Sequence, residues 1–200
     1  MSFAPASAPL DGPAAAPEPD SSGGAPLISP WSAHAPRVPA ALRAFLLEPG
    51  SLTDRLMATG ARFAVRPLKL GVDRADPHEA AALGVASNAV ILARHVALSL
   101  NDTVVVVARS VCRPACPTWA AVLDRGGRSL GLSLFAPDAP VSRGSLTFAH
   151  LADAHPLAQL AKGFEPSNTP YPARACRFSQ DGAPLLVTEA FLLSLERFPP

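Results

Sequence analysis

Two charged residues interrupt apolar stretches that are typical of buried β-strands. The first is Glu189, in "APLLVTEAFLL". Because side chains alternate between the two faces of a strand, Glu189 shares its face with Leu185, Val187, Phe191 and Leu193. Burial of a lone carboxylate is costly unless the group is paired, hydrogen-bonded or protonated. Glu189 is thus either one half of a structural ion pair or an acid or base in a closed cavity.

The second charge is Arg94, in "AVILARHVALSL". The same alternation places Arg94 on an apolar face with Val96 and Leu98. The next stretch, "TVVVVARSVC", repeats the pattern less cleanly with Arg109. Arg94 and Glu189 could pair with each other, or both could line a dry pocket that receives a polar ligand. The planar guanidinium of an arginine suits a carboxylate ligand.

Two helix starts could also bind an anion. Leu52 and Leu130 follow Ser51 and Ser129, and serine in this position is typical of a helix N-cap. The unpaired N–H groups of a first helical turn, together with the helix dipole, favour anions. The alternative for both positions is an ordinary cap with an apolar core residue behind it.

A sheet and several helices must position these residues. Apolar periodicity and cap signals predict helices over residues 38–48, 51–60, 76–84, 117–127, 129–135 and 149–162. Strands are expected over residues 61–70, 89–100, 103–112 and 174–193, with hairpin turns at Asn101-Asp102 and Asp181-Gly182. The pattern predicts an α+β fold, a single domain with a largely antiparallel sheet of about six strands and helices inserted between hairpins.

Composition limits the class of protein. The chain has 200 residues, 48% of them hydrophobic, and a formal charge of +1, which fits one globular domain and predicts no nucleic-acid partner. We place that domain at residues 30–200 and expect residues 1–29, rich in Pro and Ala, to be a disordered tail. No stretch is typical of a secretory signal or a membrane helix, so we expect a cytoplasmic protein without stable membrane insertion.

The cysteines and histidines offer little further chemistry. Cys112, Cys116 and Cys176 include no second close pair, so no zinc site is expected and the thiols are predicted to be free. His95 falls on the strand face opposite Arg94 and is predicted to be structural. No Gly-rich nucleotide loop and no metal-ligand spacing is present, so no cofactor is expected.

Taken together, these motifs resemble the chorismate pyruvate-lyase family. The resemblance covers residues 31–198 and rests on "FLLEPGSLTDRL", "LARHVAL", "RSLGLSLF" and "GAPLLVTEAFLL". It implies a chorismate lyase-like fold and substrate contacts at four positions, Leu52, Arg94, Leu130 and Glu189. These are the positions that burial and capping single out. Position 52 is often Met in the family, and the segment between Leu130 and Glu189 is longer here than in compact members.

The resemblance also implies an activity. The expected reaction eliminates pyruvate from chorismate and leaves 4-hydroxybenzoate for ubiquinone biosynthesis, in a monomeric enzyme without a metal or cofactor. Arg94 would hold an anionic group, the N–H groups of Leu52 and Leu130 a carboxylate, and Glu189 the hydroxyl and hydrogen at ring C4, as base or as hydrogen-bonding partner. The alternative is a non-catalytic domain of the same fold that binds a small aromatic carboxylate, as in some bacterial transcription regulators. Such regulators carry a helix-turn-helix segment, which residues 1–30 are not expected to form.

Overall fold

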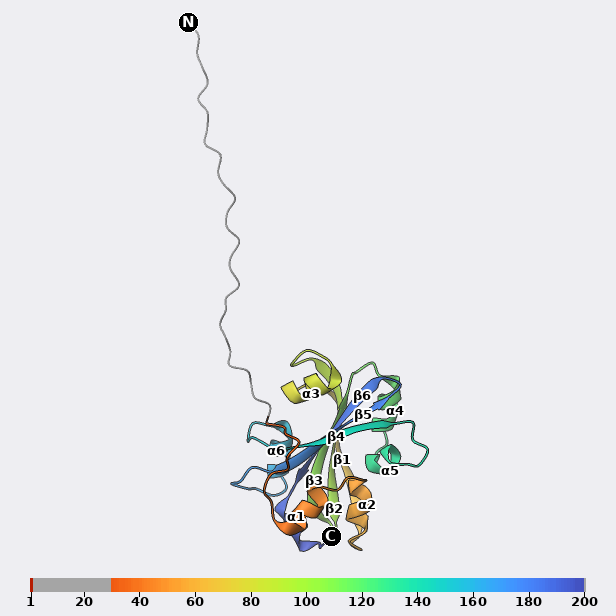
Figure 1. Ribbon diagram of the computed structural model, residues 1–200, viewed down its shortest axis with the longest axis vertical. Coiled ribbons are helices and arrows are strands. Elements are labelled where there is room, and N and C mark those ends of the chain that lie inside the picture. Colours follow the sequence, from red (N-terminus) through yellow and green to blue (C-terminus); the bar gives the residue numbers. More distant parts are fainter. Residues whose placement is uncertain (2–29, 200) are drawn as a thin grey trace.

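A six-stranded antiparallel sheet forms the centre of the molecule. The computed structural model describes Met1 and residues 30–199, so the predicted tail lies almost wholly outside the described residues. The strand order is β1-β2-β3-β6-β5-β4 (Figure 1). This confirms the predicted α+β fold with about six strands. The strands are β1 (Phe63–Arg74), β2 (Val90–Leu100), β3 (Thr103–Cys112), β4 (Ser142–His150), β5 (Pro172–Gln180) and β6 (Ala183–Phe191).

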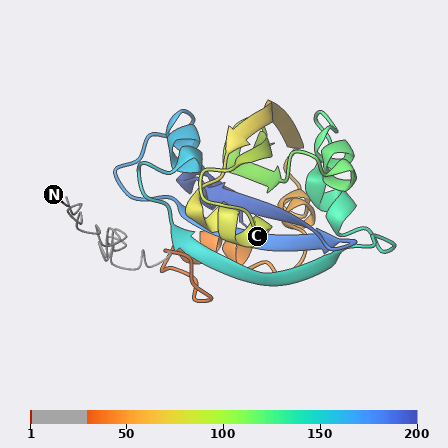
Figure 2. The same ribbon diagram turned by 90° about the horizontal axis from the view of Figure 1, so that it is seen from above.

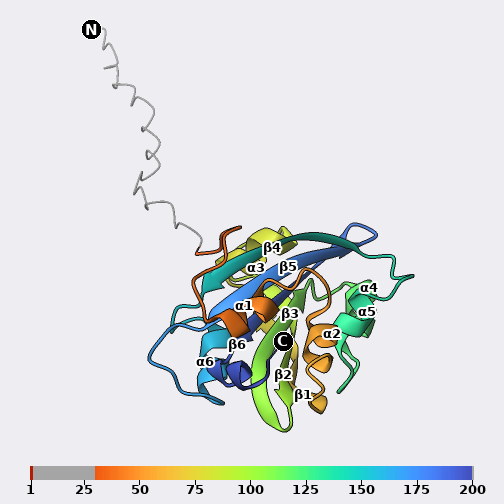
Figure 3. The same cartoon turned by 60° about the horizontal axis from the view of Figure 1, so that its bottom comes forward.

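Helices cover both faces of this sheet. The helices are α1 (Ala40–Leu46), α2 (Leu52–Met57), α3 (Pro77–Leu83), α4 (Pro117–Leu123), α5 (Leu130–Leu134) and α6 (Pro156–Lys162). The apolar residues of α1, α2, α4 and α5 pack on the face that carries Val96 and Cys112. Those of α3 and α6 pack on the face that carries Ala93 and Ala97. Figure 3 shows α1 and α2 crossing the first of these faces.

Both predicted hairpin turns are confirmed. Asn101 and Asp102 join β2 to β3 with φ values of 47° and 66°, and Asp181 and Gly182 join β5 to β6 with 51° and 77°. Two consecutive residues with positive φ are the mark of a type I′ turn, which matches the twist of the strands it connects. These two turns fix the register of the central strands, and the register decides which side chains share a face.

The interval from Ala149 to Lys162 was predicted wrongly as one helix. Strand β4 runs on to His150, and helix α6 begins only at Pro156. His155 is the N-cap of α6, and its Nδ1 accepts a hydrogen bond from Leu157 N (3.1 Å). β4 lies at the edge of the sheet, and it is largely exposed except near Phe148 and Ala149 (Figure 2). An edge strand with so few buried positions carries little apolar alternation from which to predict it.

The end of the last strand is also shorter than predicted. β6 ends at Phe191, and Leu193 begins a 3₁₀ turn over Leu193–Arg197 with 45% of its surface exposed. Leu193 therefore does not share the buried face of Glu189. Leu185 and Phe191 on that face are buried as expected, and Val187 is partly buried.

Candidate active site

The floor of a cavity is made by two rows of side chains that run across the sheet. The first row pairs Arg94 with Ser110, then Val187 and Cys176. The second row pairs Val96 with Ala108, then Glu189 and Arg174. The β3 members of the two rows, Ser110 and Ala108, are small residues, which leave space between the sheet and the helices above it.

Helices α2 and α5 and strand β4 close the space above these rows. The cavity holds about 610 Å³ unfilled by protein atoms, its open mouth included. The lining is mainly apolar, with four charged side chains and a few hydroxyl groups. It comprises Leu52, Thr53, Val65, Arg94, Val96, Leu98, Ala108, Ser110, Ser129, Leu130, Gly131, Leu134, Phe135, Arg143, Leu146, Arg174, Cys176, Phe178, Val187 and Glu189.

Arg94 is buried without a carboxylate partner. Its exposed fraction is 4%, and within the described chain no acidic group lies within ion-pair distance of it. Nη2 donates to the carbonyl oxygens of Gly126 (2.8 Å) and Arg128 (3.0 Å), while Nε and Nη1 have no acceptor among residues 30–199. Burial lowers the pKa of Arg94 from its ordinary value. An uncompensated buried cation of this kind favours an anionic ligand.

Glu189 pairs with Arg174 and not with Arg94. Arg174 Nε donates to Glu189 Oε2 at 2.6 Å, and the side chains are 4% and 17% exposed. The register explains the choice, because Arg174 lies directly opposite Glu189 on the next strand. Arg94 lies two strands away, roughly 10 Å across the sheet at the usual strand spacing. The sequence left two arrangements open for Arg94 and Glu189. The structure excludes an ion pair between them and shows that both line one cavity.

Arg174 also fixes the end of helix α1. Its Nη1 donates to the carbonyl oxygens of Phe45 (3.3 Å) and Glu48 (2.7 Å), where the last turn of the helix leaves acceptors unpaired. Arg174 is not among the residues predicted for the site. Strand alternation in "RACRFSQ" places Arg174 with Cys176 and Phe178 on an apolar face, the signal that identified Arg94.

The two helix starts are linked to each other. Ser51 Oγ accepts from Asp54 N (3.2 Å) and caps α2 as predicted. Ser129 is the N-cap residue of α5, as predicted, but its side chain makes no capping hydrogen bond. Ser129 Oγ instead lies 2.5 Å from Thr53 Oγ1. The partner is 76 residues away in the chain, which local sequence does not reveal.

Gly131 allows this close approach of α2 and α5. A Cβ atom at position 131 would lie 2.7 Å from Thr53 Oγ1 and 3.3 Å from Ser51 Oγ. Both distances are shorter than ordinary van der Waals contact, so only glycine fits without a shift of one helix. The N-termini of the two helices therefore meet over the cavity floor.

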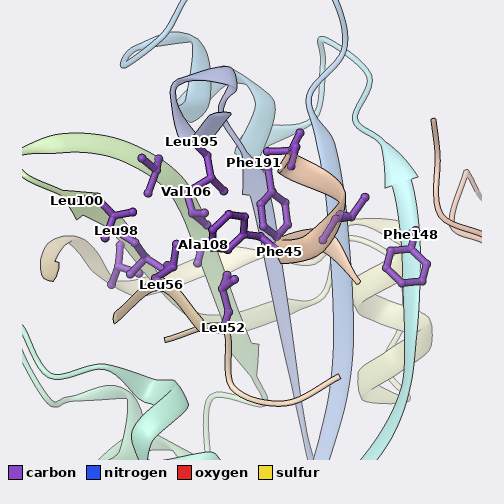
Figure 4. Packing of buried hydrophobic residues seen from close by; sticks show 14 residues of the cluster. Phe45, Leu52, Leu56, Leu98, Leu100, Val106, Ala108, Phe148, Phe191 and Leu195 are labelled. Carbon is purple, nitrogen blue, oxygen red and sulfur yellow. The ribbon is translucent and has the colours of Figure 1, made fainter. Parts of the chain in front are cut away.

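The side chains of Leu52 and Leu130 belong to the apolar core. Leu52 is 3% exposed and packs in the cluster with Phe45, Leu56 and Ala108, where it lies at one end of the group (Figure 4). Leu130 packs with the cluster around helix α4. Both residues line the cavity and start their helices, so the structure is compatible with a role for their backbone N–H groups.

Arg143 extends from β4 over the mouth of the cavity. Its Nε donates to Cys176 Sγ (3.3 Å), its Nη1 donates to the carbonyl oxygen of Pro49, and its guanidinium lies 5.0 Å from the centre of the Phe135 ring. Within residues 30–199 it has no carboxylate partner. The side chain therefore joins the edge of the sheet to the segments that precede α2 and follow α5.

Comparison with known proteins now identifies the family. The family model described as chorismate lyase matches residues 31–197. The chain belongs to the chorismate lyase family. A protein of Pseudomonas entomophila named "Probable chorismate pyruvate-lyase 1" is 37% identical over 153 residues, which cover 75% of this chain and 81% of the relative. A "Probable chorismate pyruvate-lyase" of Cupriavidus metallidurans is 35% identical over 177 residues, covering 84% of this chain and 82% of the relative.

The solved structures that resemble the chain are more distant than these members of the chorismate lyase family. The effector domain of PhnF from Mycobacterium smegmatis aligns with a TM-score of 0.48 at 18% identity, covering 72% of this chain and 90% of that domain. Structural similarity at this level does not indicate a shared function.

The four positions carried over from the chorismate lyase family lie around one cavity. Leu52, Arg94, Leu130 and Glu189 come from α2, β2, α5 and β6, and all four line it. Arg109 does not join them, because it faces the opposite side of the sheet. There it donates from Nε to Glu79 (2.6 Å) and from Nη1 to Asp73 (2.8 Å). His95 lies on that side too, with Nε2 2.7 Å from Arg109 Nη1, as its predicted structural role requires.

Three further findings on this member of the chorismate lyase family concern metal binding, membrane-spanning helices and the cysteines. Within the described residues, no three His, Cys, Asp or Glu side chains are grouped closely enough to hold a metal ion. No helix in residues 30–199 combines the length and the apolar character needed to cross a bilayer. Cys112, Cys116 and Cys176 are all free thiols.

Proposed function

We propose that this protein is a chorismate pyruvate-lyase, a carbon–oxygen lyase. The reaction breaks the C4–H bond and the C3–O bond of chorismate and forms a C3–C4 double bond, which makes the ring aromatic. The ring leaves as 4-hydroxybenzoate, and the expelled enolpyruvate takes up a proton to become pyruvate. The elimination is redox-neutral, so it requires no electron carrier. Family membership over residues 31–197 and relatives of that name at 35–37% identity support the proposal.

The charge of the cavity is the observation in this structure that carries the proposal. Three guanidinium groups and one carboxylate line it, an excess of two positive charges. Arg174 is neutralised by Glu189, whereas Arg94 and Arg143 have no acidic partner among the described residues. Chorismate carries two carboxylates, and in a mainly apolar site a matching charge strongly favours binding.

The proposed roles follow from where the groups lie. Arg94 holds an anionic group of the substrate and of the departing pyruvate, and the first N–H groups of α2 and α5, at Leu52 and Leu130, hold a carboxylate. Glu189 acts at ring C4, as base or as hydrogen-bonding partner of the hydroxyl. Arg174 positions the Glu189 carboxylate from one side at 2.6 Å. Such fixed groups raise the rate by holding a reactive conformer and by opposing developing charge.

The test is direct. Purified protein is mixed with chorismate, and 4-hydroxybenzoate and pyruvate are quantified by chromatography over time. Equal amounts of both products, dependent on the protein, support the proposal. Binding of 4-hydroxybenzoate without consumption of chorismate would instead fit the non-catalytic anion-binding module. We also propose that the enzyme is monomeric and cytoplasmic and supplies ubiquinone biosynthesis, and sedimentation and cell fractionation test the first two points.

A further inference from the structure

Ser110 carries a hydroxyl group that is open to the cavity and has no partner among residues 30–199. The residue lies in the middle of β3, is 4% exposed and lines the cavity. Its Oγ makes no hydrogen bond to any residue in the described part of the chain. A hydroxyl group that no protein group uses, in the wall of a mainly apolar cavity, keeps its donor and acceptor capacity for the molecule that fills the cavity. The position therefore calls for an acceptor or donor that enters the cavity.

Other buried serines of this chain show the ordinary state. Ser194 is 8% exposed, and its Oγ donates to Val104 O at 2.8 Å. Ser129 is equally buried, and its Oγ is bonded to Thr53. Ser110 differs from both although it lies in a regular strand with neighbours on either side.

The register places Ser110 directly beside Arg94. The two residues are opposite each other on adjacent antiparallel strands and point to the same face. Directly opposed Cβ atoms lie about 4.5–5.5 Å apart. On its other side, Ser110 is opposite the apolar residue Val187. An oxygen atom bound to the free Nε or Nη1 of Arg94 is thus within reach of Ser110 Oγ, and no group of residues 30–199 competes for that hydroxyl.

We propose that Ser110 Oγ donates a hydrogen bond to the anionic group that Arg94 holds, and that this residue positions the substrate. The inference rests on the proposed function and adds a substrate-positioning residue to it. A carboxylate is the stronger kind of acceptor for a hydroxyl donor, and Arg94 alone cannot fix its orientation, since Nη2 is already engaged by two carbonyl oxygens.

The experiment compares Ser110→Ala, Ser110→Thr and Ser194→Ala with the wild type. Ser110→Ala should raise KM for chorismate about tenfold or more, the effect of a lost hydrogen bond to a charged group, with kcat changed less than threefold. Its Tm should be close to that of the wild type, because the hydroxyl has no partner among the described residues that the substitution could remove. Ser110→Thr keeps the hydroxyl in a position suited to β-branched residues and should restore most of the affinity.

Ser194→Ala is the matched control, a buried serine with a protein partner outside the cavity. It should lower Tm and leave KM unchanged, the opposite of Ser110→Ala. A Ser110→Ala protein with lowered Tm and wild-type KM, in a preparation whose wild type is active, would overturn this inference alone. A wild type that neither consumes chorismate nor binds 4-hydroxybenzoate in calorimetry would overturn the proposed function and this inference with it.

Discussion

At the scale of single residues, Glu189 is both a proposed catalytic group and one half of a buried ion pair. Removal of one partner of such a pair typically destabilises a protein by about 3–5 kcal/mol. Glu189→Gln keeps an oxygen acceptor for Arg174 Nε and should cost much less. Turnover of chorismate should fall on the order of 100-fold or more, the usual contribution of an acid–base group. Thermal unfolding and kcat of the same preparation test both parts, and a folded variant with normal kcat would contradict the assignment.

Arg94 gives a separate prediction, because it is proposed to hold the substrate and also donates to two loop carbonyl oxygens. Arg94→Ala should weaken 4-hydroxybenzoate binding and raise KM for chorismate about 10–100-fold, as expected when a charged clamp is lost. Calorimetry with 4-hydroxybenzoate measures the first effect. Arg125→Ala is the control, since Arg125 lies exposed in the same loop, donates to Ser133 and lies outside the cavity. Equal loss in both variants would indicate a loop effect instead of a lost clamp.

Single residues were predictable from the sequence where strand alternation alone decided their position. Arg94 and Glu189 follow from it, and Arg174 would have done so. The partner of each charge was not predictable, because it depends on which strands are neighbours. Ser129 was assigned as a cap on local grounds, while its hydroxyl bonds to Thr53 from a distant part of the chain.

At the scale of elements, the contact of α2 with α5 depends on Gly131. Gly131→Ala should destabilise the protein by about 1–3 kcal/mol, the typical effect of overpacking, and should lower activity because both helices start at the cavity. Urea unfolding measures the first effect. Gly71→Ala, where no atom lies within 4 Å of the added Cβ, is the matched control and should be nearly silent. Thr53→Ala combined with Gly131→Ala should recover part of the loss, and strict additivity would argue against the predicted clash.

The cluster of charged residues around Arg109, on the face of the sheet that α3 covers, makes stability depend on pH. His95 faces Arg109, Asp73 and Lys69, and burial together with the Arg109 charge lowers the pKa of His95 from 6.5 to about 4. The unfolded chain binds a proton at this residue below pH 6.5, whereas the folded protein does so only near pH 4. The free energy of unfolding should therefore fall as the pH drops from 6.5 to 4.

His95→Gln isolates this contribution. The amide oxygen can still accept from Arg109, but the side chain does not titrate. Urea unfolding at several pH values between 7.5 and 4 should give a shallower decline for the variant than for the wild type. Parallel declines would show that other groups account for the pH dependence, such as His78, whose pKa is lowered by partial burial.

At the scale of the whole molecule, we predict that residues 30–200 are sufficient for folding and activity. Residues 1–29 contain no periodic apolar positions that a core would need. A chain that begins at Pro30 should unfold at the same temperature and turn over chorismate at the same rate as the full chain. Loss of more than a few degrees in Tm would show that the first segment packs against the domain.

The overall architecture was predictable because long, strongly patterned segments made up the centre of the sheet. Two type I′ turns and the strands beside them account for β2, β3, β5 and β6. The edge strand β4 was harder to predict from the sequence. It is held by pairing with β5 and carries few buried residues, so its sequence has no strong apolar pattern. Closure of the cavity by Arg143 likewise depends on segments that meet only in the folded chain.

Strand β3 sends Ser110 into the cavity and Arg109 into the ion-pair cluster on the other side of the sheet. A one-residue insertion or deletion between Arg94 and Ser110 would exchange these two side chains, moving a cation into the floor and leaving Glu79 without its partner. The ligand cavity and the ion-pair cluster would be disrupted together. Directed evolution of this enzyme should accordingly tolerate substitutions in β3 far better than any change in its length, and should find room for insertions in the long segment between β4 and β5.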